Sequence, residues 1–229
     1  MTDTISDPGR RAQLEAAEAQ ALSLLGMIEA EGLVQSGLSE TEVAEAIFAL
    51  AKDRFGVEQH WHRRIVRTGP NTLTTAGDYP EDRIIEADDT VYLDLGPVFE
   101  AWEADVGRTY ALGEDPDRRR LVADLAQVFD QVQAHYRKTP GITGAELYAH
   151  AVAAAEARGW AFGGAIAGHI VGEFSHRTWP GEKALTRIWP DNPRPLSDPD
   201  HLGRERHWIL EIHLVDQART FGGFYERLL

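Results

Sequence analysis

The sequence of 229 residues contains no cysteine. That absence excludes a disulfide framework, a thiolate nucleophile, and any zinc-finger or iron–sulfur site. Long apolar runs are also missing, because none approaches the roughly 20 residues that a membrane-spanning helix needs. The opening residues MTDTISDPGRR lack the apolar stretch of a signal peptide. We therefore expect a cytoplasmic protein with no membrane partner, in which any metal site would depend on His, Asp and Glu.

Basic residues are few relative to acidic ones. Lys and Arg total 23 against 37 Asp and Glu, so the net charge is −14, which argues against nucleic acid as a partner. The 43% hydrophobic and 26% charged content is ordinary for a globular protein. The length fits one large domain. We expect residues 1–10 to form a flexible leader and residues 11–229 a single domain.

The spacing of apolar residues predicts two pairs of helices, each followed by strands. The second helix of each pair begins at a capping box, Ser39 with Glu42 and Thr143 with Glu146. Residues 71–82 predict a loop, and the four prolines within 189–200 predict an irregular segment. This order predicts an α+β fold with two similar halves. The expected helices are 11–32, 39–56, 121–136 and 143–158, and the expected strands are 60–68, 91–95, 98–112, 208–215 and 221–229.

Two aspartates lie in or beside predicted strands, where aspartate is uncommon. Alternation places Val91, Leu93 and Leu95 on one face of a strand and Asp94 on the other. Asp105 follows eleven residues later, so a hairpin could bring the two carboxylates opposite each other. The alternative is a pair of solvated acids on the open face of a sheet.

A glycine-rich segment contains two histidines, His169 and His176, seven residues apart. Gly168 and Gly172 flank the first, as is typical where the backbone approaches a ligand closely. A lone histidine among apolar residues is more often a hydrogen-bonded core residue. A second histidine on the same segment favours a functional site.

Two glutamates repeat the pattern of a carboxylate inside an apolar strand. Glu211 lies in WILEIH and Glu226 lies among aromatic residues in FGGFYERLL. Either could be a buried ion pair or an exposed edge residue. Were all four carboxylates to converge, they could not all stay ionised without counter-charge. Two divalent cations would balance them, and one imidazole beside many oxygens suits Mn, Fe, Co or Zn.

The ordered set of acids and histidines resembles the M24 metallopeptidases, which comprise methionine aminopeptidases, aminopeptidase P, prolidase and the creatinases. The matching segments are VYLDLGPVFEAWEADVGRTYALG, GHIVGEFSH, WILEIHLVD and FGGFYERLL. The resemblance extends from about residue 11 to the end of the sequence. It implies the pita-bread (creatinase/aminopeptidase) fold, with two pseudo-symmetric halves around a dinuclear metal site. The length matches that catalytic domain alone.

The resemblance also implies roles for individual residues. Asp94 would bind one metal ion, Asp105 and Glu226 would bridge both ions, and His169 and Glu211 would complete the other. His176 would contact the scissile carbonyl, with a metal-bridging hydroxide as the nucleophile. Glu211 would also carry the proton to the leaving nitrogen.

One departure from the family pattern concerns a histidine that usually lies 17 to 18 residues before the first aspartate. Residues 74–78 contain none. His60 or His62 could take its place, with His62 the candidate substrate-binding residue, although their spacing differs from the family pattern and a surface or β-edge role is at least as compatible with it.

We expect a dinuclear metal-dependent hydrolase that cleaves a C–N bond, as an aminopeptidase or dipeptidase acting on small peptides, with a homodimer possible. The alternatives are a metal enzyme acting on a small amide or another metabolite, and a binding module without catalysis.

Overall fold

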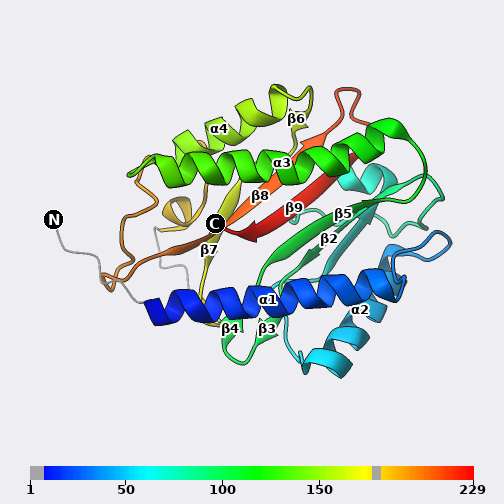
Figure 1. The fold of residues 1–229 in the computed structure, drawn as a ribbon, viewed down its shortest axis with the longest axis horizontal. Helices are drawn as coiled ribbons and strands as arrows, with labels where there is room; N and C mark the ends of the chain where they lie inside the picture. Colours follow the sequence, from blue (N-terminus) through cyan, green and yellow to red (C-terminus); the bar gives the residue numbers. More distant parts are fainter. Residues whose placement is uncertain (1–7, 177–181) are drawn as a thin grey trace.

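The computed structural model describes residues 8–176 and 182–229, and its ribbon is drawn in Figure 1. Within those ranges, no helix is both long enough and apolar enough to cross a membrane. The helices are α1 (Pro8–Ala30), α2 (Glu40–Phe55), η1 (Gly69–Leu73), α3 (Pro116–Lys138), α4 (Gly144–Glu156) and η2 (Lys183–Thr186). The strands are β1 (Ile65–Thr68), β2 (Thr90–Leu95), β3 (Val98–Phe99), β4 (Trp102–Glu103), β5 (Val106–Ala111), β6 (Ala161–Phe162), β7 (Gly168–Val171), β8 (His207–Val215) and β9 (Gly222–Leu228).

The four predicted α-helices are confirmed, and their ends follow from capping groups. The Ser39 hydroxyl accepts the Glu42 N–H, and the Glu42 carboxylate accepts the Ser39 N–H, as a capping box requires. Helix α3 begins five residues before the expected start, because the Asp115 carboxylate caps it ahead of Pro116. Helix α1 begins at Pro8, so the last three residues of the expected leader 1–10 are helical, while residues 1–7 lie outside the described ranges.

One antiparallel sheet of strands of unequal length runs through the molecule in the order β1-β2-β5-β9-β8-β6, and β7 is also paired to β8. Strands β5 and β9 meet in the middle, at the register pair Gly107 and Glu226. Each half therefore contributes two α-helices followed by an antiparallel series of strands. The predicted repetition of an α+β half is present in this topology.

The expectation of one strand over 98–112 is wrong. Residues 98–103 form a separate two-stranded hairpin, β3 with β4, and only β5 pairs with β2. The chain reverses at Glu100, which has a φ of 56°. This small hairpin turns the chain back so that Asp105 arrives immediately before β5, beside Asp94 on β2.

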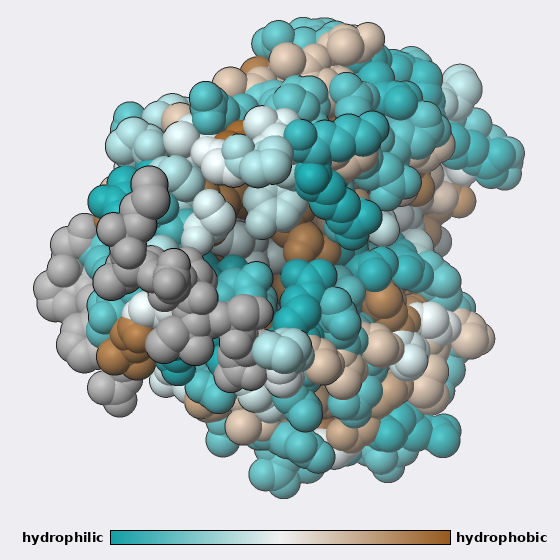
Figure 2. Space-filling view, turned by 60° about the vertical axis from the view of Figure 1, so that its left-hand side comes forward, coloured by the Kyte–Doolittle hydropathy of each residue, from teal (hydrophilic) through white to brown (hydrophobic). Residues whose placement is uncertain are grey.

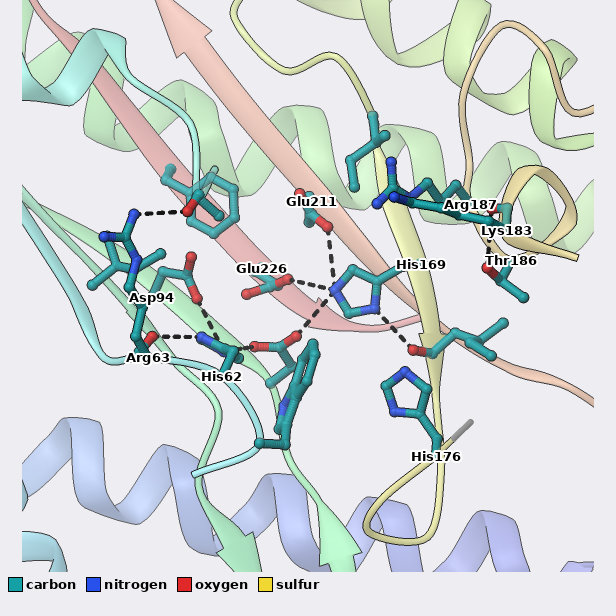
Figure 3. Close-up of a pocket in the computed structure, with 17 residues that line it drawn as sticks. His62, Arg63, Asp94, His169, His176, Lys183, Thr186, Arg187, Glu211 and Glu226 are labelled. Carbon is teal, nitrogen blue, oxygen red and sulfur yellow. Dashed lines mark hydrogen bonds and ion pairs between the residues drawn. The ribbon is translucent and has the colours of Figure 1, made fainter. Parts of the chain in front are cut away.

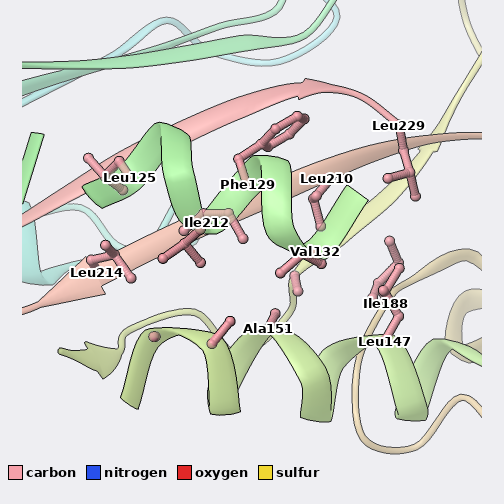
Figure 4. Packing of buried hydrophobic residues seen from close by; sticks show 14 of the residues in the cluster. Leu125, Phe129, Val132, Leu147, Ala151, Ile188, Leu210, Ile212, Leu214 and Leu229 are labelled. Atoms are coloured by element: carbon pink, nitrogen blue, oxygen red, sulfur yellow. The ribbon is translucent and has the colours of Figure 1, made fainter. Parts of the chain in front are cut away.

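The α-helices pack on one face of the sheet and leave the other face to polar side chains. In the C-terminal half, Leu210, Ile212 and Leu214 of β8 are buried against α3 and α4, as Figure 4 shows. In the N-terminal half, Val91, Leu93 and Leu95 of β2 pack in the core with residues of α1 and α2. Because side chains alternate along a strand, Asp94 and Glu211 point to the opposite face.

Candidate metal centre

The structure brings five predicted residues together on the face of the sheet opposite the helices (Figure 3). Their positions in the sheet explain the convergence: Glu211 and Glu226 are direct partners across β8 and β9, and Gly107 is paired with both Asp94 and Glu226. The five residues are Asp94 on β2, Asp105 immediately before β5, His169 on β7, Glu211 on β8 and Glu226 on β9.

A hairpin turn and a glycine bring the strands that carry the acids close to one another. Glu211 and Glu226 face each other because β8 and β9 are joined by a tight turn, predicted near Asp216. The Asp216 carboxylate holds that turn by accepting the N–H groups of Ala218, Thr220 and Phe221. In the middle of the sheet, a Cβ at Gly107 would lie 2.6 Å from the Phe224 ring, so glycine lets β5 and β9 approach closely.

His169 lies at the centre of one group of acids. Its Nε2 is 3.2 Å from Asp105 Oδ2, 3.4 Å from Glu211 Oε1 and 3.8 Å from Glu226 Oε1. Its Nδ1 lies 2.8 Å from the carbonyl oxygen of Ile170 and can donate its hydrogen there. That hydrogen bond leaves Nε2 directed at the carboxylates, which is the usual arrangement of a metal-binding histidine.

His62 lies within the same acid cluster, from the segment just before β1. Its Nε2 is 3.1 Å from Asp105 Oδ1 and 3.4 Å from Asp94 Oδ1, and its Nδ1 is 2.6 Å from the carbonyl oxygen of Arg63. Residues 74–78, where the family pattern has its histidine, run past the cavity at Ala76 without an imidazole.

Burial and mutual repulsion make three of the carboxylates, Asp94, Glu211 and Glu226, hard to ionise without a cation, whereas His62 and His169 outweigh burial at Asp105 and lower its pKa. Burial raises the pKa of Asp94 to about 6 and that of Glu211 to about 7, against the opposing effect of the nearby histidines. Burial and Asp105 together raise the pKa of Glu226 well above its usual value. Burial would lower the pKa of His62, but the Asp94 and Asp105 carboxylates outweigh it and raise that pKa to about 10. The cluster therefore needs bound positive charge, supplied by protons or by metal ions.

His176 belongs to the same cavity and is fixed by Glu103, a residue that the sequence reasoning missed. The Glu103 side chain is 1% exposed and accepts the N–H groups of Gly172 and His176, while His176 Nδ1 lies 2.5 Å from its Oε2. Because Nδ1 contacts Glu103, Nε2 is the ring nitrogen of His176 that can contact a ligand in the cavity. The signal for Glu103 was another acid in a β-like segment, two residues before Asp105.

Comparisons with known proteins identify the family of this chain. The model of metallopeptidase family M24 matches residues 15–198. The chain belongs to this family. The expected resemblance to this metallopeptidase family is confirmed.

Solved structures and one curated relative are similar to this chain in fold or in sequence. A prolidase from Thermococcus sibiricus superposes with a TM-score of 0.72 at 23% identity, covering 98% of this chain and 56% of that one. A methionine aminopeptidase from Rickettsia prowazekii gives 0.73 at 12% identity, covering 100% and 95%. A Xaa-Pro dipeptidase from Lactobacillus delbrueckii subsp. lactis is 29% identical over 114 residues, which are 50% of this chain and 30% of the dipeptidase. These structural matches confirm the predicted pita-bread fold, and this M24 chain spans just over half the length of that prolidase.

The donor set of this M24 chain fits divalent metal ions. Two groups have donor atoms within 4.8 Å of one another, namely His62 with Asp94 and Asp105, and Asp105 with His169 and Glu226. Asp105 belongs to both groups, as a bridging ligand would. Glu226 Oε2 is buried and has no hydrogen-bond partner among the described residues. A buried carboxylate oxygen without a donor is costly, and a cation at that position would satisfy it.

A cavity of about 440 Å³ opens over the acid cluster and is large enough for a small ligand. The Trp61 ring lies against three of its histidines, with centroids 4.5 Å from His62, 5.2 Å from His169 and 5.4 Å from His176. The sequence reasoning missed Trp61, because nothing near it in the chain marks the contacts. Figure 2 shows a hollow between the two parts of the molecule, with hydrophilic residues along much of its rim.

Proposed function

We propose that this M24 protein is a dinuclear metal-dependent peptidase that hydrolyses a C–N bond near the amino end of a short peptide. The observation that carries the proposal is the convergence of three other carboxylates and the His169 imidazole around Asp105, which is itself 2% exposed. Acids so deeply buried and so close to one another are hard to explain without cations. The expected ligand residues are those named from the sequence: Asp94, Asp105, His169, Glu211 and Glu226.

The chain's own residues supply the remaining chemistry. Two divalent ions at this site would lower the pKa of a shared water and polarise the substrate carbonyl. Glu211 is the expected proton carrier, because it lines the cavity beside the other expected ligands. With Nδ1–H donated to Glu103, the imidazolium form of His176 would donate its Nε2–H to the carbonyl oxygen of the substrate.

The shape and charge of the cavity favour a small substrate with an anionic end. Lys183 and Arg187 line the cavity together with the acid cluster (Figure 3). A short peptide has a cationic and an anionic terminus, which would match the two kinds of charge. The names of the relatives, a dipeptidase, a prolidase and an aminopeptidase, agree with a substrate of this size.

A small amide that is not a peptide is the second candidate. The observation that favours it is the cavity wall at Ala76, within the segment 74–78 where the family pattern expects a histidine. A binding module without catalysis is a poorer match, because the chain retains every expected ligand.

The first experiment is elemental analysis of the purified protein before and after chelation, with Asp105→Ala and the control Asp130→Ala on the exposed surface of α3. We expect close to two equivalents of Mn, Fe, Co or Zn in the unaltered protein and in the control. Asp105→Ala should lose both ions, because Asp105 belongs to both groups of donors. Loaded protein should then be assayed on dipeptides, tripeptides and small amides.

Absence of metal after reconstitution would refute the proposal. Hydrolysis of amides but of no peptide would replace it with the second candidate.

A further inference from the structure

The two halves of the molecule repeat an ordered set of three potential ligands. The N-terminal half supplies His62, Asp94 and Asp105, and the C-terminal half supplies His169, Glu211 and Glu226. In each half the order is one histidine, then two acids. The spacings differ between the halves, at 32 and 11 residues in one and 42 and 15 in the other.

The sheet relates the two sets by an approximate two-fold axis between β5 and β9. Outward from that axis, β2 corresponds to β8; β1 is the outer neighbour of β2, and both β7 and β6 are outer neighbours of β8. Asp94 on β2 therefore corresponds to Glu211 on β8. His62, just before β1, and His169, on β7, then both lie one strand further out.

The two imidazoles also have matching environments. Each Nδ1 lies within hydrogen-bond distance of the carbonyl oxygen of the next residue, at 2.6 Å for His62 and 2.8 Å for His169. Each Nε2 faces a different oxygen of the same carboxylate, Asp105 Oδ1 at 3.1 Å and Asp105 Oδ2 at 3.2 Å. Their side chains are almost equally buried, at 20% and 19% exposed. The arguments that make His169 a metal ligand apply equally to His62.

The backbone beside His62 leaves room for that ring and for nothing more. A Cβ at Gly96 would lie 2.3 Å from His62 Cδ2 and 2.6 Å from Trp61 Nε1. The Trp61 ring also lies against His169, and its Nε1 donates to the carbonyl oxygen of Ala104. Packing therefore holds the His62 ring at the cluster, as pre-organisation of a ligand requires.

We propose that His62 Nε2 is a sixth protein ligand, which binds the metal ion held by Asp94 and Asp105. The site then has one imidazole on each side of Asp105, whereas the five expected ligands include His169 alone. The inference rests on the proposed dinuclear function and concerns only the ligands of one ion. Under the alternative, His62 contacts substrate and leaves both ions unaffected.

The direct test counts imidazole ligands in the unaltered protein loaded with Co²⁺. A histidine bound through Nε2, with its Nδ1–H in a hydrogen bond, gives an exchangeable proton signal strongly shifted by the paramagnetic ion. We expect two such signals in the proton NMR spectrum, from His62 and His169. A single signal with both Co²⁺ ions bound would overturn the inference and leave the dinuclear site standing.

The second test compares His62→Ala with His60→Ala by titration with Mn²⁺ and elemental analysis. His60 is a suitable control, because its ring packs on Phe48 and it is not among the cavity-lining residues. We expect His62→Ala to lower the affinity for one of the two ions on the order of 100-fold. Removing a residue that only hydrogen-bonds to a metal ligand already lowers metal affinity roughly 10- to 100-fold. The other ion should bind as before, and the control should bind both.

The outcomes separate this inference from the proposed function. Unchanged binding of both ions by His62→Ala, with a raised KM for peptides, would show substrate contact and overturn the inference alone. Failure of the unaltered protein to bind any Mn²⁺ or Co²⁺ would overturn the proposed function and the inference together.

Discussion

Replacing Glu103 by glutamine should destabilise the protein without touching any of the five expected metal ligands. The Glu103 carboxylate accepts three hydrogen bonds: Oε2 faces the Gly172 N–H and His176 Nδ1, and Oε1 faces the His176 N–H. A glutamine has one carbonyl oxygen, so its NH₂ group must face at least one of these donors. A buried donor without an acceptor costs about 1–3 kcal/mol, and exchanging the charged acceptor for a neutral one weakens the remaining bonds by roughly 1 kcal/mol. We expect a loss of about 2–4 kcal/mol in the free energy of unfolding.

The assay is urea denaturation of Glu103→Gln in the presence of chelator, so that metal occupancy does not contribute. The matched control is Glu173→Gln, an exposed carboxylate on the segment that leads to His176. Its change should stay within about 0.5 kcal/mol, as is usual for surface positions. If Glu103→Gln also stayed within that limit, the argument that this carboxylate is essential to the local hydrogen bonding would be wrong.

Three further predictions concern the site and the fold. Gly96→Ala should lower metal affinity and cost about 1–3 kcal/mol of stability, because the added Cβ would overlap the rings of His62 and Trp61. The control is Gly172→Ala, which should be tolerated because the nearest atom to its added Cβ is 3.7 Å away. Denaturation and metal titration of both variants would check this. Metal affinity should rise from about pH 5 to about pH 10, because the expected ligands must release protons to bind: burial raises the pKa of Asp94 to about 6 and of Glu211 to about 7, and against burial the neighbouring carboxylates raise the pKa of His62 to about 10 and of His169 to about 9. Calorimetry in two buffers should detect protons released on binding, and finding none would contradict the reasoning. Ser39→Ala should cost about 1 kcal/mol by removing the capping box of α2, measured by thermal unfolding.

The pH effect has the opposite sign for the metal-free protein. Both acids have folded-state pKa values above their ordinary ones, 3.8 for Asp94 and 4.5 for Glu211. The folded state then binds more protons than the unfolded state between about pH 4 and pH 7. Stability without metal should therefore fall as pH rises through that window.

Much of the fold could be predicted because local signals and burial agree. Alternation along VYLDL and WILEIH assigned the apolar residues and the acids to opposite faces of each strand, and two capping boxes marked helix starts. The division of 98–112 could not be predicted, because the reversal at Glu100 uses a positive φ without the glycine or asparagine that normally marks one.

The candidate site was only partly visible in the sequence. Carboxylates inside apolar strands are conspicuous, so the acids could be found from the residues alone. Glu103 was not, because its role depends on contact with His176, 73 residues away. His62 stayed an open candidate for a similar reason, since its partner Asp105 is 43 residues distant. Such contacts depend on the folded topology, which local patterns do not contain.

The two hydrophobic clusters have a consequence for cooperativity. One cluster joins α1 and α2 to β2, the other joins α3 and α4 to β8, and the central strands β5 and β9 share a single register pair. Asp105 from the first half approaches His169 from the second, so an ion between them would link the two clusters directly. Two smaller clusters already span both halves, Leu14 with Val171, Ile209 and Leu228, and Ile65 and Tyr92 with Phe224. Removal of the ions should therefore lower the temperature of a single calorimetric transition rather than divide it. Occupancy of the site would then set how strongly the two halves stabilise each other.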